Sequence, residues 1–274
     1  MTTGSRAPSP TTPAPEPVNA EPGFDVSFIM PAYNEEEVVG VTAKRLLEAF
    51  ARAGVRFELV AVDNGSTDRT GEILRALRHE HPNLVVHRID LNEGYGKGVL
   101  EGIPLCRAPW VGIIPADGQV DAEDVVRLYQ SAAATNGHIV AKVRRRFRLD
   151  GLTRKFVSTT YNLFVRLMWP TLASLDINGS PKLLRRDKLL AMELGSKTFL
   201  LDPELMVKAH YMGMRVLEFN VFARMRGSGL SHVRASTCWE FVHELLAYRF
   251  SPALRRWRRQ VAAGQAAVPA AHAR

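Results

Sequence analysis

The chain is poor in cysteine, with only Cys106 and Cys238 among its 274 residues. These two lie far apart and form no CxxC pair, which argues against a disulfide framework and against a zinc site. No stretch reaches the roughly 18 uninterrupted apolar residues of a membrane-spanning helix, and the N-terminus lacks a secretory signal pattern. We therefore expect a cytoplasmic protein, either free or held peripherally on the cytosolic face of a membrane.

Large apolar side chains are scarce in residues 1–22, which contain six prolines. Such a segment cannot bury enough surface to become ordered, so we expect a disordered tail there and another over residues 261–274. The chain as a whole is 46% apolar, which supports a sizeable core between the tails. We expect one domain over residues 23–234 and a helical segment over residues 235–260.

Apolar strand-like runs alternate with amphipathic stretches from Phe24 onward. They read FDVSFIM, FELVAV, LVVHRI, WVGII and HIVAKV, with MRVLEFNVF as a closing strand after a helical LLDPELMVKAHYMG. This alternation predicts an α/β fold whose mostly parallel sheet carries helices on both faces. Ligands of such sheets bind beyond the carboxyl ends of the strands, so we expect the site in four polar stretches that follow strands. They are PAYNEEE, DNGSTD, LNEGYGKG and PADGQVD.

The first two stretches each allow a structural and a functional interpretation. In DNGSTD, the Ser and Thr can cap the next helix, whereas Asp63 at the strand end can accept hydrogen bonds from a nucleobase or ribose. The acidic residues of PAYNEEE suit a helix N-terminus. Its Pro31, Tyr33 and Glu35 can instead form an aromatic and carboxylate pocket for a base.

The glycine-rich stretch NEGYGKG matches neither a P-loop nor a dinucleotide-binding fingerprint. Val99 stands where the fingerprint would need its third glycine, which disfavours a dehydrogenase. Lys97 can reach a phosphate of a bound nucleotide, or it can remain a solvated surface lysine.

Asp117 and Gln119 in PADGQVD can be metal ligands or part of a polar turn. Mg²⁺ and Mn²⁺ take oxygen ligands, commonly one or two carboxylates together with substrate phosphates. Residues two apart in an extended backbone point to the same side, which would bring these two side chains together. Asp-Gly is also a favoured turn sequence, and Asp121 suits the start of the next helix.

In this order, the four stretches resemble those of family-two glycosyltransferases with the GT-A fold, and most closely the polyprenol-phosphate (dolichol-phosphate) mannose synthases. The resemblance runs from about Phe28 to Ser231. It implies a single domain on a Rossmann-like sheet, and an inverting transfer of a hexose from a nucleotide-diphosphate sugar, of the GDP-mannose or UDP-glucose type, to polyprenyl phosphate. The alternatives are a glycosyltransferase with a soluble hydroxyl acceptor and an inactive nucleotide-binding relative.

The residues that the resemblance assigns to the donor nucleotide are Pro31, Tyr33, Glu35 and Asp63. Asp117 and Gln119 would hold the Mg²⁺ or Mn²⁺ that neutralises the donor diphosphate. Related enzymes often read DADGQ at this point, and here Pro115 replaces the first Asp. Arg226, in RGSGLS, would meet the same diphosphate.

The basic segment RFRLDGLTRKFVSTTYN resembles the part of these synthases that binds the acceptor phosphate. Arg154 and Ser158 have the family's R-x-x-x-S spacing, and Arg145 can help to orient the phosphate. Seven basic residues and one acid lie between Lys142 and Lys155. Such a run is typical of a surface that meets phosphates or anionic lipid, or of a solvated basic face.

The candidate catalytic residues are Asp117, Arg226 and Asp202. Negative charge grows on the leaving nucleoside diphosphate, and a divalent ion on Asp117 together with Arg226 would stabilise it. A lipid monophosphate, with a second pKa near about 6, is already ionised at neutral pH and needs no strong base. A hydroxyl acceptor would need one, for which Asp202 or Asp176 is the candidate.

The net charge of +8 favours anionic partners. Nucleic acid is disfavoured, because the acidic residues at the strand ends would repel its backbone. The apolar stripe of the C-terminal segment comprises Trp239, Phe241, Val242, Leu245 and Leu246. With the RRWRR of residues 255–259, this segment can lie on an anionic membrane or pack on the domain as an ordinary helix. A lipid-acting enzyme of this kind would dock peripherally or use a membrane partner.

Overall fold

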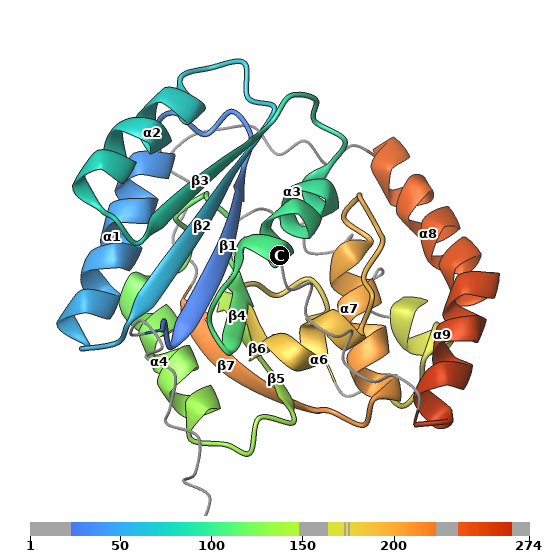
Figure 1. The fold of residues 1–274 in the computed structure, drawn as a ribbon. Coiled ribbons are helices and arrows are strands. Elements are labelled where there is room, and N and C mark those ends of the chain that lie inside the picture. Colours follow the sequence, from blue (N-terminus) through green and yellow to red (C-terminus); the bar gives the residue numbers. More distant parts are fainter. Residues whose placement is uncertain (1–22, 148–163, 173, 175, 223–234, 265–274) are drawn as a thin grey trace, which may run out of the picture.

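The computed structural model describes residues 23–147, 164–172, 174, 176–222 and 235–264. For residues 145–147, 222 and 235–241 it describes the backbone alone. Within these ranges, seven strands form one sheet in the order β3-β2-β1-β4-β6-β5-β7 (Figure 1). The strands are β1 (Val26–Ala32), β2 (Phe57–Asn64), β3 (Leu84–Ile89), β4 (Trp110–Ile113), β5 (Ile139–Phe147), β6 (Lys182–Arg185) and β7 (Arg215–Phe222).

The sheet is mostly parallel, which confirms the predicted fold class. β1 pairs in parallel with β2 and with β4, β2 with β3, and β5 with β7. β6 runs antiparallel to both β4 and β5. The parallel strands therefore deliver the loops that follow them to one edge of the sheet.

Helices cover both faces of the sheet, so the molecule has three layers (Figure 1). The helices are α1 (Val39–Arg52), α2 (Thr70–Glu80), α3 (Tyr95–Gly102), η1 (Ile103–Leu105), α4 (Ala122–Ala133), α6 (Arg186–Ala191), α7 (Leu201–Tyr211), α8 (Ala235–Arg249) and α9 (Pro252–Ala262). α1, α2 and α4 pack on one face, and α3, α6, α7, α8 and α9 pack on the other.

Alternation of side chains along β1 builds a separate core on each face. Phe28 and Met30 pack in the layer of α1, where Phe50 stacks on Phe57 with ring centroids 4.1 Å apart. Ile29 points to the opposite layer. Every residue of β1 and β2 is buried, which explains why both strands read as continuous apolar runs.

One strand was not predicted from the sequence, because β6 has only four residues, Lys-Leu-Leu-Arg, too few for a clear alternation. It lies between β4 and β5 and pairs Lys182 with Ile113 on one side and with Lys142 on the other. In addition, the boundaries of two elements differ from the predicted ones. β5 continues four residues beyond HIVAKV, and α3 begins inside the glycine-rich turn, at Tyr95.

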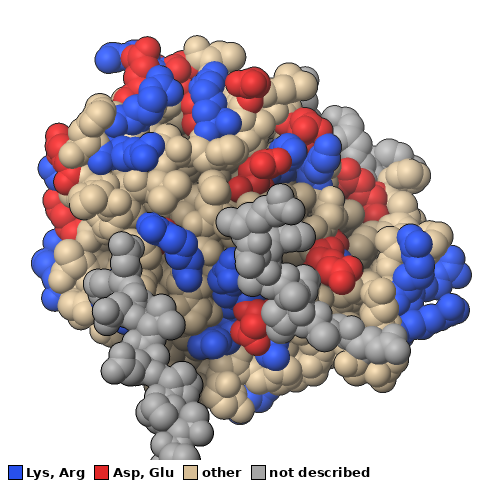
Figure 2. Space-filling model, viewed as in Figure 1, with Lys and Arg blue, Asp and Glu red and all other residues tan. Residues whose placement is uncertain are grey.

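The C-terminal segment forms α8 and α9, which pack on the domain. Leu245, Leu254 and Trp257 are buried in the core that also contains residues of α3, α6 and α7. Trp257 Nε1 donates to Ala191 O at 3.0 Å. The outward face of α9 carries exposed arginines. Lys and Arg side chains gather on the side of the molecule where α8 and α9 lie (Figure 2). No helix among the described residues is long and apolar enough to cross a membrane.

Candidate active site

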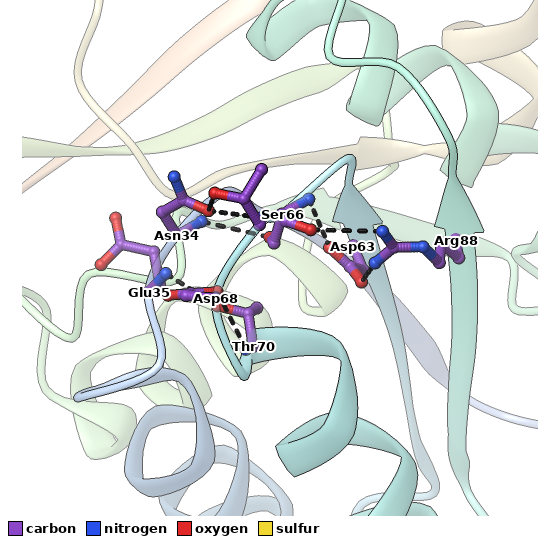
Figure 3. Close-up of polar contacts among 8 residues, drawn as sticks. Asn34, Glu35, Asp63, Ser66, Asp68, Thr70 and Arg88 are labelled. Atoms are coloured by element: carbon purple, nitrogen blue, oxygen red, sulfur yellow. Dashed lines mark hydrogen bonds and ion pairs between the residues drawn. The ribbon is translucent and has the colours of Figure 1, made fainter.

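The loops after β1 and β2 are joined into one hydrogen-bonded unit at the carboxyl edge of the sheet (Figure 3). The Asn34 N–H donates to Ser66 Oγ at 3.1 Å, and Asn34 Oδ1 accepts from the Thr67 N–H at 2.8 Å. The Glu35 N–H donates to Thr70 Oγ1 at 2.8 Å. The prediction that Ser66 or Thr67 caps the next helix is therefore wrong, because their side chains bind the neighbouring loop and α2 begins only at Thr70.

A second pair of contacts closes this unit on its outer side. The Glu36 N–H donates to Asp68 Oδ2 at 3.1 Å, and the Arg69 N–H donates to Glu36 Oε2 at 2.9 Å. Burial of the Asp68 carboxylate disfavours its charge, but hydrogen bonds from Thr70 and Glu36 hold its pKa below the ordinary value. The carboxylates of these two stretches thus order the loops, as turn-forming residues do.

Asp63 is fully buried at the end of β2. Its Oδ1 accepts from the Ser66 N–H at 3.0 Å, and its Oδ2 forms an ion pair with Arg88 Nη1 on β3 (Figure 3). Arg88, whose side chain is 44% exposed, also donates to Ser66 O at 3.2 Å. Arg88 was predicted only as part of a strand, although an arginine near a strand end is the signal that could have identified it.

The strand register brings the predicted nucleotide residues to one edge. Pro31 lies opposite Val62, and Ala32 lies opposite Asp63. Tyr33, directly after β1, is 43% exposed. The structure therefore places Pro31 and Asp63 on adjacent strands, with Tyr33 and Glu35 in the loop that follows, while their contact with a nucleotide stays a prediction.

The glycine-rich stretch is fastened to the end of β2 by Asn64, a residue that the sequence analysis did not single out. Asn64 Nδ2 donates to Gly94 O at 2.9 Å and to Asn92 Oδ1 at 3.3 Å. Asn64 Oδ1 is buried and has no hydrogen-bond partner among the described residues. A buried acceptor of this kind, at the edge where ligands bind, is available to an N–H or O–H donor.

Lys97 lies on α3 between two carboxylates. Its Nζ is 2.6 Å from Glu101 Oε1 and 3.8 Å from Glu93 Oε1. The hydrogen bond to Glu101 raises the pKa of Lys97 above its ordinary value. These contacts favour the surface-lysine interpretation, and its role at a donor phosphate stays a prediction.

The predicted metal motif follows β4 and turns sharply. Gly118 has a φ of 63°, and the Gln119 N–H donates to Asp117 Oδ1 at 3.2 Å. The backbone between Asp117 and Gln119 is therefore a turn, not the extended stretch considered in the sequence analysis. Asp117 is partly exposed, and Asp121 stands at the N-cap position of α4, as predicted.

The ligand chemistry of this turn fits a hard divalent cation. One carboxylate and one amide are oxygen donors of the kind that Mg²⁺ and Mn²⁺ take, with substrate phosphates and waters as the other ligands. The residues described contain no group of three or more His, Cys, Asp or Glu side chains that could enclose a metal. The oxygen atoms of Asp117 and Gln119 have the ligand chemistry for a cation that also binds substrate phosphates.

A small hollow borders the motif on the side of α1 and α4. Its lining includes Thr42 and Arg45 of α1 together with Asp117 and Asp121. The predicted nucleotide residues after β1 and β2 do not line this hollow. We therefore do not assign the hollow to the nucleotide.

Two lysines, Lys142 on β5 and Lys182 on β6, are fully buried. The sequence pattern placed Lys142 in a basic surface run, which is wrong for this residue, and it gave Lys182 no role. Lys182, opposite Ile113 at the end of β4, places its Nζ 2.5 Å from Asp202 Oδ1. Its neighbour Lys142 donates to Ser174 Oγ at 3.2 Å. Burial first, and then the charge of Lys182, lower the pKa of Lys142 to about 8.

Counter-charges and carbonyl groups complete this cluster. Lys142 Nζ lies 3.5 Å from Glu218 Oε1 and donates to Asp176 O. Ser174 Oγ donates to Glu218 Oε1 at 2.7 Å. Asp202, a candidate catalytic residue, is therefore a buried partner of Lys182.

The structure describes no side chain for the remaining predicted site residues. Arg154, Ser158 and Arg226 lie outside them, and Arg145 is described only by its backbone in β5. Their roles at the acceptor phosphate and at the donor diphosphate stay predictions.

Solved structures share this fold. A crystal structure of glucosyl-3-phosphoglycerate synthase from Mycobacterium tuberculosis, in complex with Mn²⁺, UDP and glucosyl-3-phosphoglycerate, matches with a TM-score of 0.60. The match has 17% sequence identity and covers 91% of this chain and 82% of that chain. A crystal structure of a mycobacterial protein gives a TM-score of 0.64 at 17% identity, over 91% and 77% of the two chains. At this identity the likeness concerns the fold, which is the GT-A fold of these enzymes.

The sequence identifies the family. The model of glycosyl transferase family 2 matches residues 27–191, and the chain belongs to that family. This confirms the resemblance drawn from the four polar stretches.

Curated relatives match over the first part of the fold. An undecaprenyl-phosphate 4-deoxy-4-formamido-L-arabinose transferase of Pectobacterium carotovorum subsp. carotovorum is 34% identical over 144 residues, which are 52% of this chain and 43% of the relative. A transferase of the same name from Pseudomonas aeruginosa is 36% identical over 143 residues, 52% and 41% of the two chains. The matched region thus spans less than half of the length of these relatives.

Proposed function

We propose that this protein is an inverting glycosyltransferase that moves a sugar from a nucleoside-diphosphate donor to a polyprenyl phosphate. The observation that supports the proposal is that the four polar stretches follow neighbouring parallel strands and so lie at one edge of the sheet, with Asp117 and Gln119 after β4, the strand that pairs with β1. Membership of family 2 and the names of the undecaprenyl-phosphate transferases agree with it.

The donor would lie across the ends of β1, β2 and β4. Tyr33 and Glu35 would contact the base or ribose. Asp63 holds the turn after β2, and the Ser66 hydroxyl of that turn accepts a hydrogen bond from the Asn34 N–H, between Tyr33 and Glu35. Asp117 and Gln119 would hold Mg²⁺ or Mn²⁺, which neutralises the diphosphate as it leaves. Arg226 would add a second positive charge at that diphosphate. Groups that are held in position before the reaction would cost little reorganisation when charge develops.

A phosphate acceptor suits the buried charges better than a hydroxyl acceptor does. Asp202 lies 2.5 Å from the ammonium of Lys182, so its carboxylate already serves as a counter-charge. A phosphate monoester is ionised at neutral pH and attacks the anomeric carbon without a general base. Arg154 and Ser158, with Arg145, would orient that phosphate.

Transfer to a lipid phosphate can be tested with a matched pair of acceptors. We expect radiolabel from a panel of nucleotide sugars, including one that carries 4-deoxy-4-formamido-L-arabinose, to enter the lipid extract when undecaprenyl phosphate and Mn²⁺ are present. Undecaprenol, which differs only in lacking the phosphate, is expected to receive none. Label on undecaprenol alone would identify a hydroxyl acceptor. No thermal stabilisation by any nucleoside diphosphate with Mn²⁺ would contradict a donor site altogether.

Peripheral attachment to the cytosolic face of a membrane is part of this proposal, and α9 is the element that favours it. Leu254 and Trp257 use the apolar face of α9 to pack on the core, so that face is not available to enter a bilayer. The exposed face carries Arg255, Arg256, Arg258 and Arg259. Attachment would therefore be mainly electrostatic, worth about 1 kcal/mol for each arginine near an anionic surface.

We expect the chain to sediment with vesicles that contain anionic phospholipid at low salt, and to be released at high salt, where screening shortens the range of the attraction. Exchanging the four α9 arginines for glutamine should abolish sedimentation. The matched control exchanges four arginines on the opposite layer, namely Arg52, Arg75, Arg78 and Arg127. Equal binding by the two variants, or binding that salt does not affect, would count against α9 as the docking element.

A further inference from the structure

Residues 193–198 form a loop whose backbone is hydrogen-bonded to Glu204, a buried carboxylate on α7. Both oxygens of Glu204 accept from the Gly195 N–H at 3.2 Å, and Oε2 also accepts from the Ser196 N–H at 2.8 Å. Glu204 is only 3% exposed, and its Oε1 also accepts a hydrogen bond from Lys208 Nζ at 2.8 Å. Charge-assisted hydrogen bonds of this kind are about twice as strong as neutral ones, so the loop backbone is firmly fixed.

The same loop also lies directly against the glycine-rich stretch. The Lys97 N–H donates to Lys197 O at 3.0 Å. A Cβ added at Gly94 would lie 2.6 Å from Lys197 O, and one added at Gly96 would overlap the carbonyl oxygen of Ser196. These glycines are therefore required by the close approach of two backbones. The aromatic rings of Tyr95 and Phe199 stack beside them with centroids 5.5 Å apart.

The glycine-rich stretch in turn lies against the strand ends that form the donor site. Gly94 O accepts from Asn64 Nδ2 at 2.9 Å, and a Cβ at Gly98 would lie 3.0 Å from Pro31 Cβ. A continuous set of contacts thus runs from Glu204, through residues 195–198 and the glycine-rich stretch, to Pro31 and Asn64.

Glu204 and its loop are also connected to the C-terminal helices, through Lys208 and Thr198. Lys208 Nζ, besides contacting Glu204, donates to Glu193 O at 2.9 Å and lies 5.2 Å from the ring centre of Trp257 on α9. Thr198 Oγ1 donates to Glu244 Oε2 on α8 at 2.9 Å. The loop is consequently enclosed between the donor edge and α8 and α9.

We infer that Glu204 is a positioning residue for the donor site, acting through residues 195–198 on the glycine-rich stretch. Glu204 does not touch the donor. It sets the place of the backbone that closes one side of the donor site, as outer-shell groups do for the residues in contact with a ligand. The inference rests on the proposed function only in naming that ligand as a nucleotide sugar.

The test needs a variant that loosens the loop without leaving a buried charge unpaired. Glu204→Gln alone would strand the Lys208 ammonium and can unfold the chain, so the informative variant is Glu204→Gln with Lys208→Met. The matched control is Glu48→Gln with Arg52→Met, which removes an exposed i,i+4 pair from α1 on the opposite layer. Circular dichroism melting establishes that each variant is folded.

Two readouts are expected to change in the Glu204 variant and not in the control. Amide hydrogen exchange of residues 92–98 should accelerate at least about tenfold, because the local opening of that stretch becomes easier. The dissociation constant of UDP or GDP with Mn²⁺, measured by calorimetry, should rise about tenfold, and the donor KM should rise with it while kcat changes less. A role in general stability alone would accelerate exchange throughout the sheet.

The outcomes separate this inference from the proposed function. Unchanged exchange over residues 92–98 in a folded Glu204 variant would overturn the inference, whatever the wild-type chain binds. Faster exchange with an unchanged nucleotide dissociation constant would also overturn it, because the loop would then have no part in the site. A wild-type chain that binds no nucleoside diphosphate would refute the proposed function, and the exchange measurement alone would then decide whether Glu204 positions the glycine-rich stretch.

Discussion

Exchanging Asp117 for Asn is expected to lower sugar transfer about 100- to 1000-fold, the size of effect seen when one preorganised group is removed from a developing charge. The amide removes the negative charge that attracts a divalent cation. It keeps the size of the side chain and an oxygen that can accept the 3.2 Å hydrogen bond from the Gln119 N–H. The turn should therefore keep its shape while the cation is bound less tightly.

The loss should appear as a higher Mn²⁺ concentration for half-maximal rate and as a smaller stabilisation by nucleoside diphosphate with Mn²⁺. The matched control is Asp124→Asn, in the first turn of α4, where Asp124 pairs with Arg127. This variant should transfer sugar at the wild-type rate. If the Asp117→Asn variant keeps the wild-type rate and the wild-type Mn²⁺ requirement, Asp117 is not a ligand of the metal.

The positions of the strands, and the edge of the sheet at which the polar stretches meet, could be predicted because apolar runs in the sequence are followed by polar turns. Phe57–Asn64 and Leu84–Ile89 have the predicted places, and the polar stretches do meet at one edge. What the loops do with their side chains could not be predicted. Ser66 binds the backbone of Asn34, a partner 32 residues away in sequence that only the sheet brings near.

Charged residues of the interior were missed for a related reason. A lysine in sequence is expected at the surface, since an unpaired buried ammonium is costly. Lys142 and Lys182 are buried because Glu218 and Asp202 arrive from β7 and α7, elements far along the chain. The contacts of Glu204 could not be predicted for the same reason, because its partners are backbone N–H groups of a loop that has no motif of its own.

Exchanging Lys182 for Met is expected to lower the free energy of unfolding by about 3–5 kcal/mol, the usual cost of leaving one member of a buried ion pair without its partner. Lys182 is fully buried, and Asp202 is 7% exposed. Urea unfolding followed by circular dichroism measures the change. Lys44→Met, an exposed lysine on α1, is the control and should alter the free energy by less than about 0.5 kcal/mol.

A double variant, Lys182→Met with Asp202→Leu, should recover most of that loss, because apolar groups of similar volume can replace a buried pair at little cost. It also decides what Asp202 does in the reaction. If the carboxylate is only the counter-charge of Lys182, the folded double variant should still transfer sugar to polyprenyl phosphate, because an ionised phosphate needs no base. If Asp202 activates a hydroxyl acceptor, the double variant should be stable and inactive, since the base is gone while the fold remains. A stable double variant that has lost transfer to a verified phosphate acceptor would give Asp202 a direct part in the chemistry.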